Sequence, residues 1–282
     1  MKNVEDLFSP PYNFAGLSSP YADLETAKVA ILPAPYDSTT EWHSGTREGL
    51  QAIINASQYL ELYDIELGQE IHKLGIHTLP EIQPLLGSPE QMVQQVYRVA
   101  KELIQHNKFV VMLGGEHSIS LGMVQALKEK YNDLCVLQLD AHADLRDEYS
   151  GTRYSHACVM RRVLELCPVI QVGIRSLSWE EQEFLNQNKM QPFYTSTATP
   201  DSASAQRVVS SLSHNVYVSI DLDVFDPSIM SAVGTPEPGG MQWQEVLNLL
   251  RPVTLHKHVV GFDLVEVCPR EGPPPALSWQ RN

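Results

Sequence analysis

Short apolar runs alternate with amphipathic stretches along most of this chain. Six apolar runs have the length of buried β-strands, at residues 29–33, 109–113, 134–139, 169–174, 216–220 and 259–267. Between them, apolar residues recur at helical spacing in the segments 49–58, 89–103, 121–131, 158–166, 179–187, 203–212 and 245–250. Strands separated by helices of this size predict βαβ units and a parallel sheet that helices cover on both faces.

The alternation is continuous, which favours a single domain. Its clearest helix start is Ser-Pro-Glu-Gln at residues 88–91, with a serine N-cap, a proline at the first helical position and a glutamine that completes a capping box. No internal repeat, low-complexity tract or linker interrupts the pattern. We therefore expect residues 1–282 to form one domain.

Three of the apolar runs are followed at once by side chains that can bind metals. These clusters are Gly-Gly-Glu-His at residues 114–117, Asp-Ala-His-Ala-Asp at residues 140–144 and Asp-Leu-Asp at residues 221–223. In an extended chain, residues i, i+2 and i+4 point to one side, so Asp140, His142 and Asp144 should converge and Asp221 should join Asp223. Ligands of open parallel sheets bind outside the carboxyl ends of the strands, which places all three clusters at one location.

The chemistry of these side chains indicates metal ions. Buried carboxylates are costly unless positive charge compensates them. The donor set holds two imidazoles, four carboxylates and no thiolate, which favours Mn²⁺ over a structural Zn²⁺ site. Six ligands exceed the need of one tetrahedral ion but suit two ions that share bridging carboxylates and activate a water. We therefore predict two Mn²⁺ per chain, with the ligands His117, Asp140, His142, Asp144, Asp221 and Asp223.

Composition and charge narrow the class of partner. The chain is 43% apolar and 19% charged, as expected of a soluble globular protein. A formal net charge of −14 argues against nucleic acid or anionic membrane as a partner. The same charge suits a cationic substrate, although solubility alone would also explain it.

Several absences favour a cytoplasmic protein. The N-terminus lacks the apolar core of a secretory signal, and no run approaches the ~18 apolar residues of a membrane span. The cysteines are scattered and form no C-x-x-C pair, which is typical of a reduced compartment: Cys135, Cys158, Cys167 and Cys268.

Four sequence blocks together resemble the signature motifs of the ureohydrolases, the arginase/agmatinase family. They are residues 114–118 (Gly-Gly-Glu-His-Ser), 140–144, 219–227 (Ser-Ile-Asp-Leu-Asp-Val-Phe-Asp-Pro) and 234–240 (Gly-Thr-Pro-Glu-Pro-Gly-Gly). The resemblance extends over residues 29–269. It implies a three-layer α/β/α fold of the arginase/deacetylase-like type, with a mostly parallel central sheet and a binuclear manganese centre. It also implies a homo-oligomer, a trimer or a hexamer.

The resemblance assigns a role to each metal ligand. His117 and Asp144 would bind one manganese ion. His142 and Asp223 would bind the other. The two remaining carboxylates, Asp140 and Asp221, would bridge both ions.

Three catalytic roles follow from the same motifs. His156, within Tyr-Ser-His-Ala at residues 154–157, matches an active-site histidine that shuttles a proton or orients the substrate. Viewed alone, it would read as a surface histidine at a helix start. Glu266 matches the glutamate that pairs with the substrate guanidinium, a charge-assisted contact that fixes orientation. Asp144 would relay a proton to the leaving amine, and the products would be urea and an amine.

The substrate is a small cationic guanidino compound, and the sequence favours agmatine. Arginases carry Asn two residues after the last ligand of the Asp-x-His-x-Asp block, whereas this chain has Arg146, as agmatinases do. Agmatine would be cleaved to putrescine and urea. Its far ammonium could meet Asp147 or Glu148, unless these belong to a solvated loop. Guanidinobutyrate, guanidine and arginine remain alternative substrates.

The end of the chain departs from the family pattern. From about residue 270 it carries three consecutive prolines, which cannot form the final amphipathic helix usual in relatives. This keeps open a second class of function, a catalytically impaired binding protein on the same scaffold. Deacetylase-like amide hydrolysis is a third hypothesis, but the paired histidines of that chemistry do not occur in the sequence.

Overall fold

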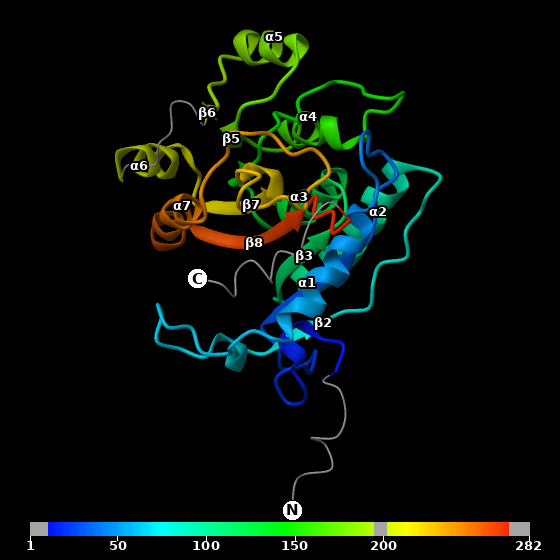
Figure 1. Ribbon diagram of the computed structural model, residues 1–282, viewed down its shortest axis with the longest axis vertical. Helices are drawn as coiled ribbons and strands as arrows, with labels where there is room; N and C mark the ends of the chain where they lie inside the picture. Colours follow the sequence, from blue (N-terminus) through cyan, green and yellow to red (C-terminus); the bar gives the residue numbers. More distant parts are fainter. Residues whose placement is uncertain (1–10, 195–201, 271–282) are drawn as a thin grey trace, which may run out of the picture.

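The computed structural model describes residues 11–194 and 202–270, and its centre is one eight-stranded sheet (Figure 1). The strands are β1 (Val29–Ala34), β2 (Ile76–Thr78), β3 (Phe109–Gly114), β4 (Leu134–Leu139), β5 (Val169–Ile174), β6 (Phe193–Tyr194), β7 (Asn215–Asp221) and β8 (His258–Val265). Their order is β2-β1-β3-β8-β7-β4-β5-β6, and every neighbouring pair is parallel. The predicted parallel sheet is confirmed.

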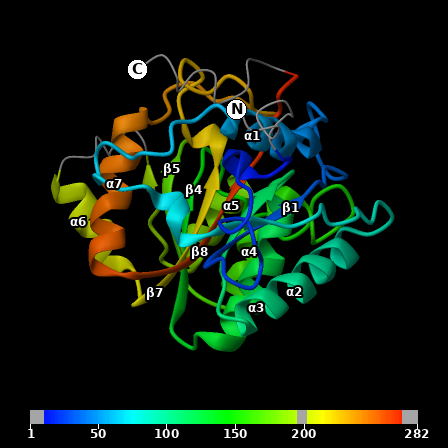
Figure 2. The ribbon, with the colours of Figure 1, turned by 90° about the horizontal axis from the view of Figure 1, so that it is seen from below.

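Helices cover both faces of this sheet. They are α1 (Gly49–Ser57), α2 (Pro89–Gln105), α3 (Ser120–Lys130), α4 (Val159–Leu164), α5 (Trp179–Gln187), α6 (Ser202–Ser211) and α7 (Trp243–His256). Figure 2 shows α2 and α3 on one side of the sheet and α6 and α7 on the other. The three-layer α/β/α fold is therefore confirmed.

The pleat of the strands explains how two separate cores form. In β3, Val110 and Met112 pack into the core that contains residues of α2, α3 and α4. The alternate residues, Val111 and Leu113, pack with residues of α1 on the opposite face. Successive side chains of a strand point to opposite faces, so a continuous apolar run supplies both cores at once.

Sequence patterns missed the two edge strands and misplaced some ends. β2 and β6 are three and two residues long, too short to produce a periodic signal. α7 is longer than the predicted segment 245–250, because Gln242 and Glu245 form a capping box and the helix continues through Pro252. β8 ends at Val265 rather than at residue 267, since Glu266 adopts a positive φ of 66° that leaves the strand conformation.

The topology brings the predicted clusters together. β3, β8, β7 and β4 are consecutive neighbours in the sheet, and the clusters follow β3, β4 and β7. Gly115, directly after β3, allows a close approach of two chain segments: a Cβ there would lie 1.9 Å from the carbonyl oxygen of Tyr36. This contact fixes the start of the turn that carries His117.

Two sequence-based predictions can be compared only with the residues that the structure describes. The predicted departure from the family beyond residue 270 falls almost wholly on residues 271–282, which lie outside them. Within residues 11–194 and 202–270, no helix combines the length and apolarity needed to cross a membrane.

Candidate metal centre and active site

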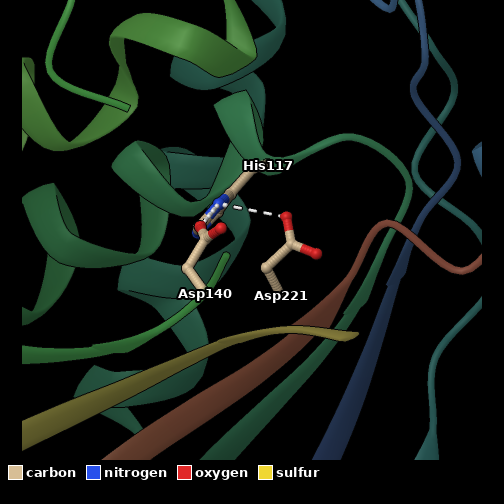
Figure 3. Close-up of side chains that lie close together, drawn as sticks. All are labelled: His117, Asp140 and Asp221. Atoms are coloured by element: carbon tan, nitrogen blue, oxygen red, sulfur yellow. Dashed lines mark ion pairs between the residues drawn. The ribbon is translucent and has the colours of Figure 1, made fainter. Parts of the chain in front are cut away.

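Three strand ends form the first group of metal-binding atoms. His117 lies in the 3₁₀ turn His117–Ile119 after β3, Asp140 follows β4 directly, and Asp221 is the last residue of β7. His117 Nδ1 lies 3.0 Å from Asp140 Oδ2 and 3.5 Å from Asp221 Oδ2 (Figure 3). These three side chains offer ligand atoms within 4.8 Å of one another.

A second group shares Asp140 with the first. His142 Nδ1 lies 2.8 Å from Asp223 Oδ2 and 3.7 Å from Asp140 Oδ1. These three residues again offer ligand atoms within 4.8 Å of one another. Two adjacent cation positions with a carboxylate between them are the arrangement expected of a two-metal site.

The clusters converge through turns rather than through the extended chain that the spacing suggested. Asp144 has a left-handed backbone, with φ of 54°, and its Oδ2 lies 3.0 Å from His117 Nδ1. Asp221 and Asp223 are joined by the 3₁₀ turn Leu222–Val224, in which Asp221 Oδ1 accepts a hydrogen bond of 3.0 Å from the Asp223 amide. The expected residues come together, through turns rather than through the extended backbone on which the expectation was conditional.

The electrostatics of these groups require positive charge. Burial, together with repulsion by Asp144 and Asp223, raises the pKa of Asp140 to about 7. Burial and the neighbouring Asp223 and Asp140 hold the pKa of Asp221 well above its usual value. Divalent cations would reverse this situation, because they favour the charged form of every carboxylate around them.

Contacts behind His117 prepare its Nδ1 for a cation. The Ser219 hydroxyl donates to Asp263 Oδ1 at 2.8 Å, so its oxygen is free to accept from His117 Nε2, 2.9 Å away. This network places the proton on Nε2 and leaves the Nδ1 lone pair directed at the carboxylates. Nδ1 makes no hydrogen bond within the described part of the chain. Such an outer partner is typical of metal-binding histidines, and the donor set therefore fits divalent ions.

Glu266 lies beside this centre. Its backbone is left-handed, and its Oε1 accepts a 2.8 Å hydrogen bond from the His117 amide. Burial, followed by repulsion from Glu116, raises the pKa of Glu266 well above its usual value. A buried carboxylate of this kind is best stabilised by a cationic partner, as a guanidinium would be.

His156 is oriented by a neighbouring hydroxyl. Thr39 Oγ1 lies 3.2 Å from His156 Nδ1 and also accepts a 3.1 Å hydrogen bond from the His156 amide. The same hydroxyl donates to Glu116 Oε1 at 2.5 Å, and the Thr39 amide donates to Glu116 Oε2 at 2.6 Å. His156 is thus a half-buried residue of an ordered network, not the surface histidine that it resembles in isolation.

A cavity of about 260 Å³ joins these residues to the surface. Its lining includes His117, His142, Asp144, Asp221, His156 and Glu266, and also the residues Thr40, Glu41, Trp42 and His43 of one loop. We call residues 37–45 the mouth loop. Asp223 and Asp140 lie behind this lining and complete the metal-binding groups.

The acidic residues expected at the far end of the substrate do not line this cavity. Asp147 instead pairs with Arg162 and, at 3.3 Å, with Arg153. Glu148 is exposed and lies outside the lining. The structure favours the alternative interpretation of both residues, a solvated loop.

Sequence reasoning missed the residues that orient the ligands. Asp263 and Ser219 gave a usable signal, because they are polar residues within apolar strands and must find partners when buried. Thr39 gave none, since a threonine in a loop has no periodic or chemical context in the sequence. Glu116 stood within a recognised motif, but the motif did not reveal its contact with Thr39.

Comparison with known proteins agrees with this geometry. The profile of the Arginase family matches residues 27–274. An N(1)-aminopropylagmatine ureohydrolase of Synechocystis sp. is 38% identical over 89% of this chain and 84% of the relative. An agmatinase of Pyrococcus horikoshii is 36% identical over 91% of this chain and 89% of the relative.

A solved structure shows the same architecture. The agmatine ureohydrolase of Thermoplasma volcanium superposes with a TM-score of 0.86 and 30% identity, over 98% of this chain and 92% of that one. The parallel α/β sheet, with histidine and aspartate clusters at its strand ends that could bind metal ions, is the architecture of arginase-like hydrolases. Within that class, the chain belongs to the Arginase family, as an agmatinase-like ureohydrolase.

Proposed function

We propose that this protein is a manganese-dependent hydrolase that cleaves the guanidino group of a linear amine with water, releasing urea and leaving the alkyl-bound nitrogen on the product amine. The observation that carries the proposal is the pair of three-ligand groups that share Asp140. They lie at the buried end of a cavity that Glu266 and His156 also line. A centre of this kind suits hydrolysis of a guanidinium, which is planar, resonance-stabilised and a poor electrophile.

Two Mn²⁺ would be held by the residues described above. In the proposed assignment, His117 and Asp144 would hold one ion, His142 and Asp223 would hold the other, and Asp140 and Asp221 would serve both. The close contacts around Asp140 support its bridging role. When bound, the ions would supply an activated water near neutral pH.

The protein residues would orient the substrate and move the proton. Glu266 would accept hydrogen bonds from the guanidinium, because its carboxylate lines the cavity and is fixed through the His117 amide. Asp144 would pass a proton to the leaving amine nitrogen. His156, held by Thr39, would assist as a proton shuttle or as a substrate-orienting group.

The proposed substrates are agmatine and its N(1)-aminopropyl derivative. Agmatine follows from Arg146 and the motifs around it, and a relative with 36% identity is named agmatinase. The longer amine is favoured by relatives with 35–38% identity that are named N(1)-aminopropylagmatine ureohydrolases. Both carry a guanidinium at one end and an ammonium at the other.

The experiment is urea release by Mn²⁺-loaded protein across a panel of guanidino compounds. The panel holds agmatine, N(1)-aminopropylagmatine, 4-guanidinobutyrate, arginine and guanidine. We expect turnover of one or both of the first two and little of the others. Absence of urea from every compound, with metal shown to be bound, would refute the proposal and favour the catalytically impaired alternative.

Three further expectations accompany the proposal. We expect a single domain and a cytoplasmic protein, and all four cysteines are buried, as small apolar side chains of a reduced protein would be. We also expect a homo-oligomer, a trimer or a hexamer. Light scattering on the purified protein measures the mass directly, and a monomer at micromolar concentration would contradict this last expectation.

A further inference from the structure

The outer end of the cavity has the chemistry of an ammonium site. Glu41 and Trp42 of the mouth loop line it, and both side chains are exposed. Trp42 is 74% exposed and stacks on His43, with ring centroids 5.1 Å apart. An aromatic face beside a carboxylate is the combination that binds alkylammonium groups, through charge and through the ring quadrupole.

Glu41 lies near a second residue that lines the cavity, Tyr149. The Glu41 carboxylate raises the pKa of the Tyr149 hydroxyl, as a neighbouring acceptor does. The Tyr149 ring packs edge-on against His156, at 6.0 Å between centroids. Glu41 is therefore linked through one side chain to the catalytic histidine.

The mouth loop itself is anchored at both ends. The buried Asp37 accepts a 2.9 Å hydrogen bond from the Gly45 amide and pairs with Arg47. Thr39 ties the loop to Glu116 and His156. A loop held in this way keeps Glu41 at a defined distance from the metal-binding residues, so the distance can discriminate between substrates.

We propose that Glu41, with Trp42 and Tyr149, forms the subsite for the ammonium tail of the substrate. A substrate with its guanidinium at Glu266 runs outward along the cavity and ends at the mouth loop. This assignment rests on the proposed function for the identity of the substrate. It also replaces the sequence-based expectation of Asp147 or Glu148 in this role.

One neighbouring charge opposes the assignment and is part of the test. Arg146 also lines the cavity, and its guanidinium lies 4.9 Å from the centre of the Tyr149 ring. Because the Arg146 guanidinium packs over the Tyr149 ring, the Glu41 carboxylate remains available to the ammonium group of the substrate. A substrate with an anionic tail would instead pair with the Arg146 guanidinium.

The kinetic test compares Glu41→Gln with the matched control Glu148→Gln, an exposed carboxylate outside the cavity. The substrates share the guanidinium and differ in tail charge: agmatine and N(1)-aminopropylagmatine, neutral butylguanidine, and anionic 4-guanidinobutyrate. We expect Glu41→Gln to lower kcat/KM about three- to five-fold for the cationic tails, mainly through KM, as for a partly exposed ion pair. It should leave butylguanidine unchanged and raise kcat/KM for 4-guanidinobutyrate, and Glu148→Gln should change none of them.

Other outcomes overturn the assignment. An equal change for every tail would make Glu41 a structural residue only, and no change would remove it from the site. A wild-type preference for 4-guanidinobutyrate over both amines would make Arg146 the partner of the tail.

A binding measurement separates this inference from the proposed function. Calorimetric titration with spermidine, a polyamine without a guanidinium, needs no turnover. We expect binding about three- to five-fold weaker in Glu41→Gln than in Glu148→Gln, and weaker again as salt is raised. Equal affinity in both variants would overturn the subsite, whether or not the enzyme releases urea.

Discussion

At the scale of single residues, the centre depends on two carboxylates in unfavourable backbone conformations. Asp144 and Glu266 both have positive φ, at 54° and 66°. For a non-glycine residue this costs of order 1–3 kcal/mol and persists only where surrounding contacts enforce it. The Glu266 side chain is held by the His117 amide, and the Asp144 side chain by proximity to His117 Nδ1. These backbone conformations direct both carboxylates toward His117, Glu266 to its backbone amide and Asp144 to its imidazole.

Replacing Asp223 by Ala tests the ligand assignment. The variant removes the carboxylate closest to His142 Nδ1, at 2.8 Å. We expect it to retain one manganese ion instead of two and to lose urea release, because the second position loses one of the two side chains that would bind only that ion. Metal content by mass spectrometry, beside Glu148→Gln as the control, measures this. Two ions per chain in Asp223→Ala would refute the assignment.

Replacing Thr39 by Val tests the orientation of His156. The substitution keeps the shape of the side chain but removes the hydroxyl that contacts His156 and Glu116. We expect kcat to fall about ten-fold, the effect of ~1.4 kcal/mol, with KM little changed.

Thr39→Ser is the matched control for this prediction. It restores the hydroxyl and should return most of the activity. Loss of activity in both variants, or a loss that follows the melting temperature, would indicate a packing role instead.

At the scale of elements, α5 supports the turn that carries Asp144. Glu181 and Ser178 form a capping box at the start of this helix. The Ser178 amide donates to Glu181 Oε2 at 2.7 Å, and the Glu181 amide donates to Ser178 Oγ at 3.3 Å. The other carboxylate oxygen of Glu181 accepts a 2.9 Å hydrogen bond from the Leu145 amide. The N-terminus of α5 and the turn that carries Asp144 therefore share one buried carboxylate.

Replacing Glu181 by Ala should weaken both features. We expect a loss of about 2 kcal/mol in unfolding free energy, because buried amides lose their acceptor. We also expect weaker binding of the ion that Asp144 holds. Denaturant unfolding and metal titration measure the two effects. Glu183→Ala, an exposed position on the same helix, is the control and should change neither.

At the scale of the whole molecule, the sheet order creates the site. β8 and β7 lie between β3 and β4, so four strand ends meet although the third and fourth strands are consecutive in the chain. His117, Asp140, Asp221 and Glu266 each follow or end one of these neighbouring strands. The candidate centre therefore forms only when these four strands are paired, and we expect metal binding to be coupled to folding.

Removal of metal tests this coupling. A ligand that binds the folded state alone raises stability by about 2.7 kcal/mol at one hundred times its dissociation constant. We therefore expect Mn²⁺ to raise the melting temperature and a chelator to reverse the shift. An unchanged melting temperature would contradict an intact centre. Asp223→Ala should show a smaller rise than the wild type.

The type of fold and the candidate ligands follow from local signals in the sequence. Apolar runs reveal buried strands because each residue's hydrophobicity favours its burial. Histidine and aspartate side chains reveal candidate metal ligands because their nitrogen and oxygen atoms bind divalent ions. These local signals identified β3, β4 and β7 and every candidate ligand.

Which of these groups come together depends on the folded chain as a whole. The sheet order, the left-handed turn at Asp144 and the network through Thr39 depend on contacts between segments far apart in the chain. The same is true of the substrate tail: the sequence offered Asp147 or Glu148, with a solvated loop as the alternative, whereas Glu41 lines the cavity. The chemistry of each side chain and its neighbours in the sequence indicate which groups it can bind, whereas the packing of the sheet and helices determines which groups lie beside it.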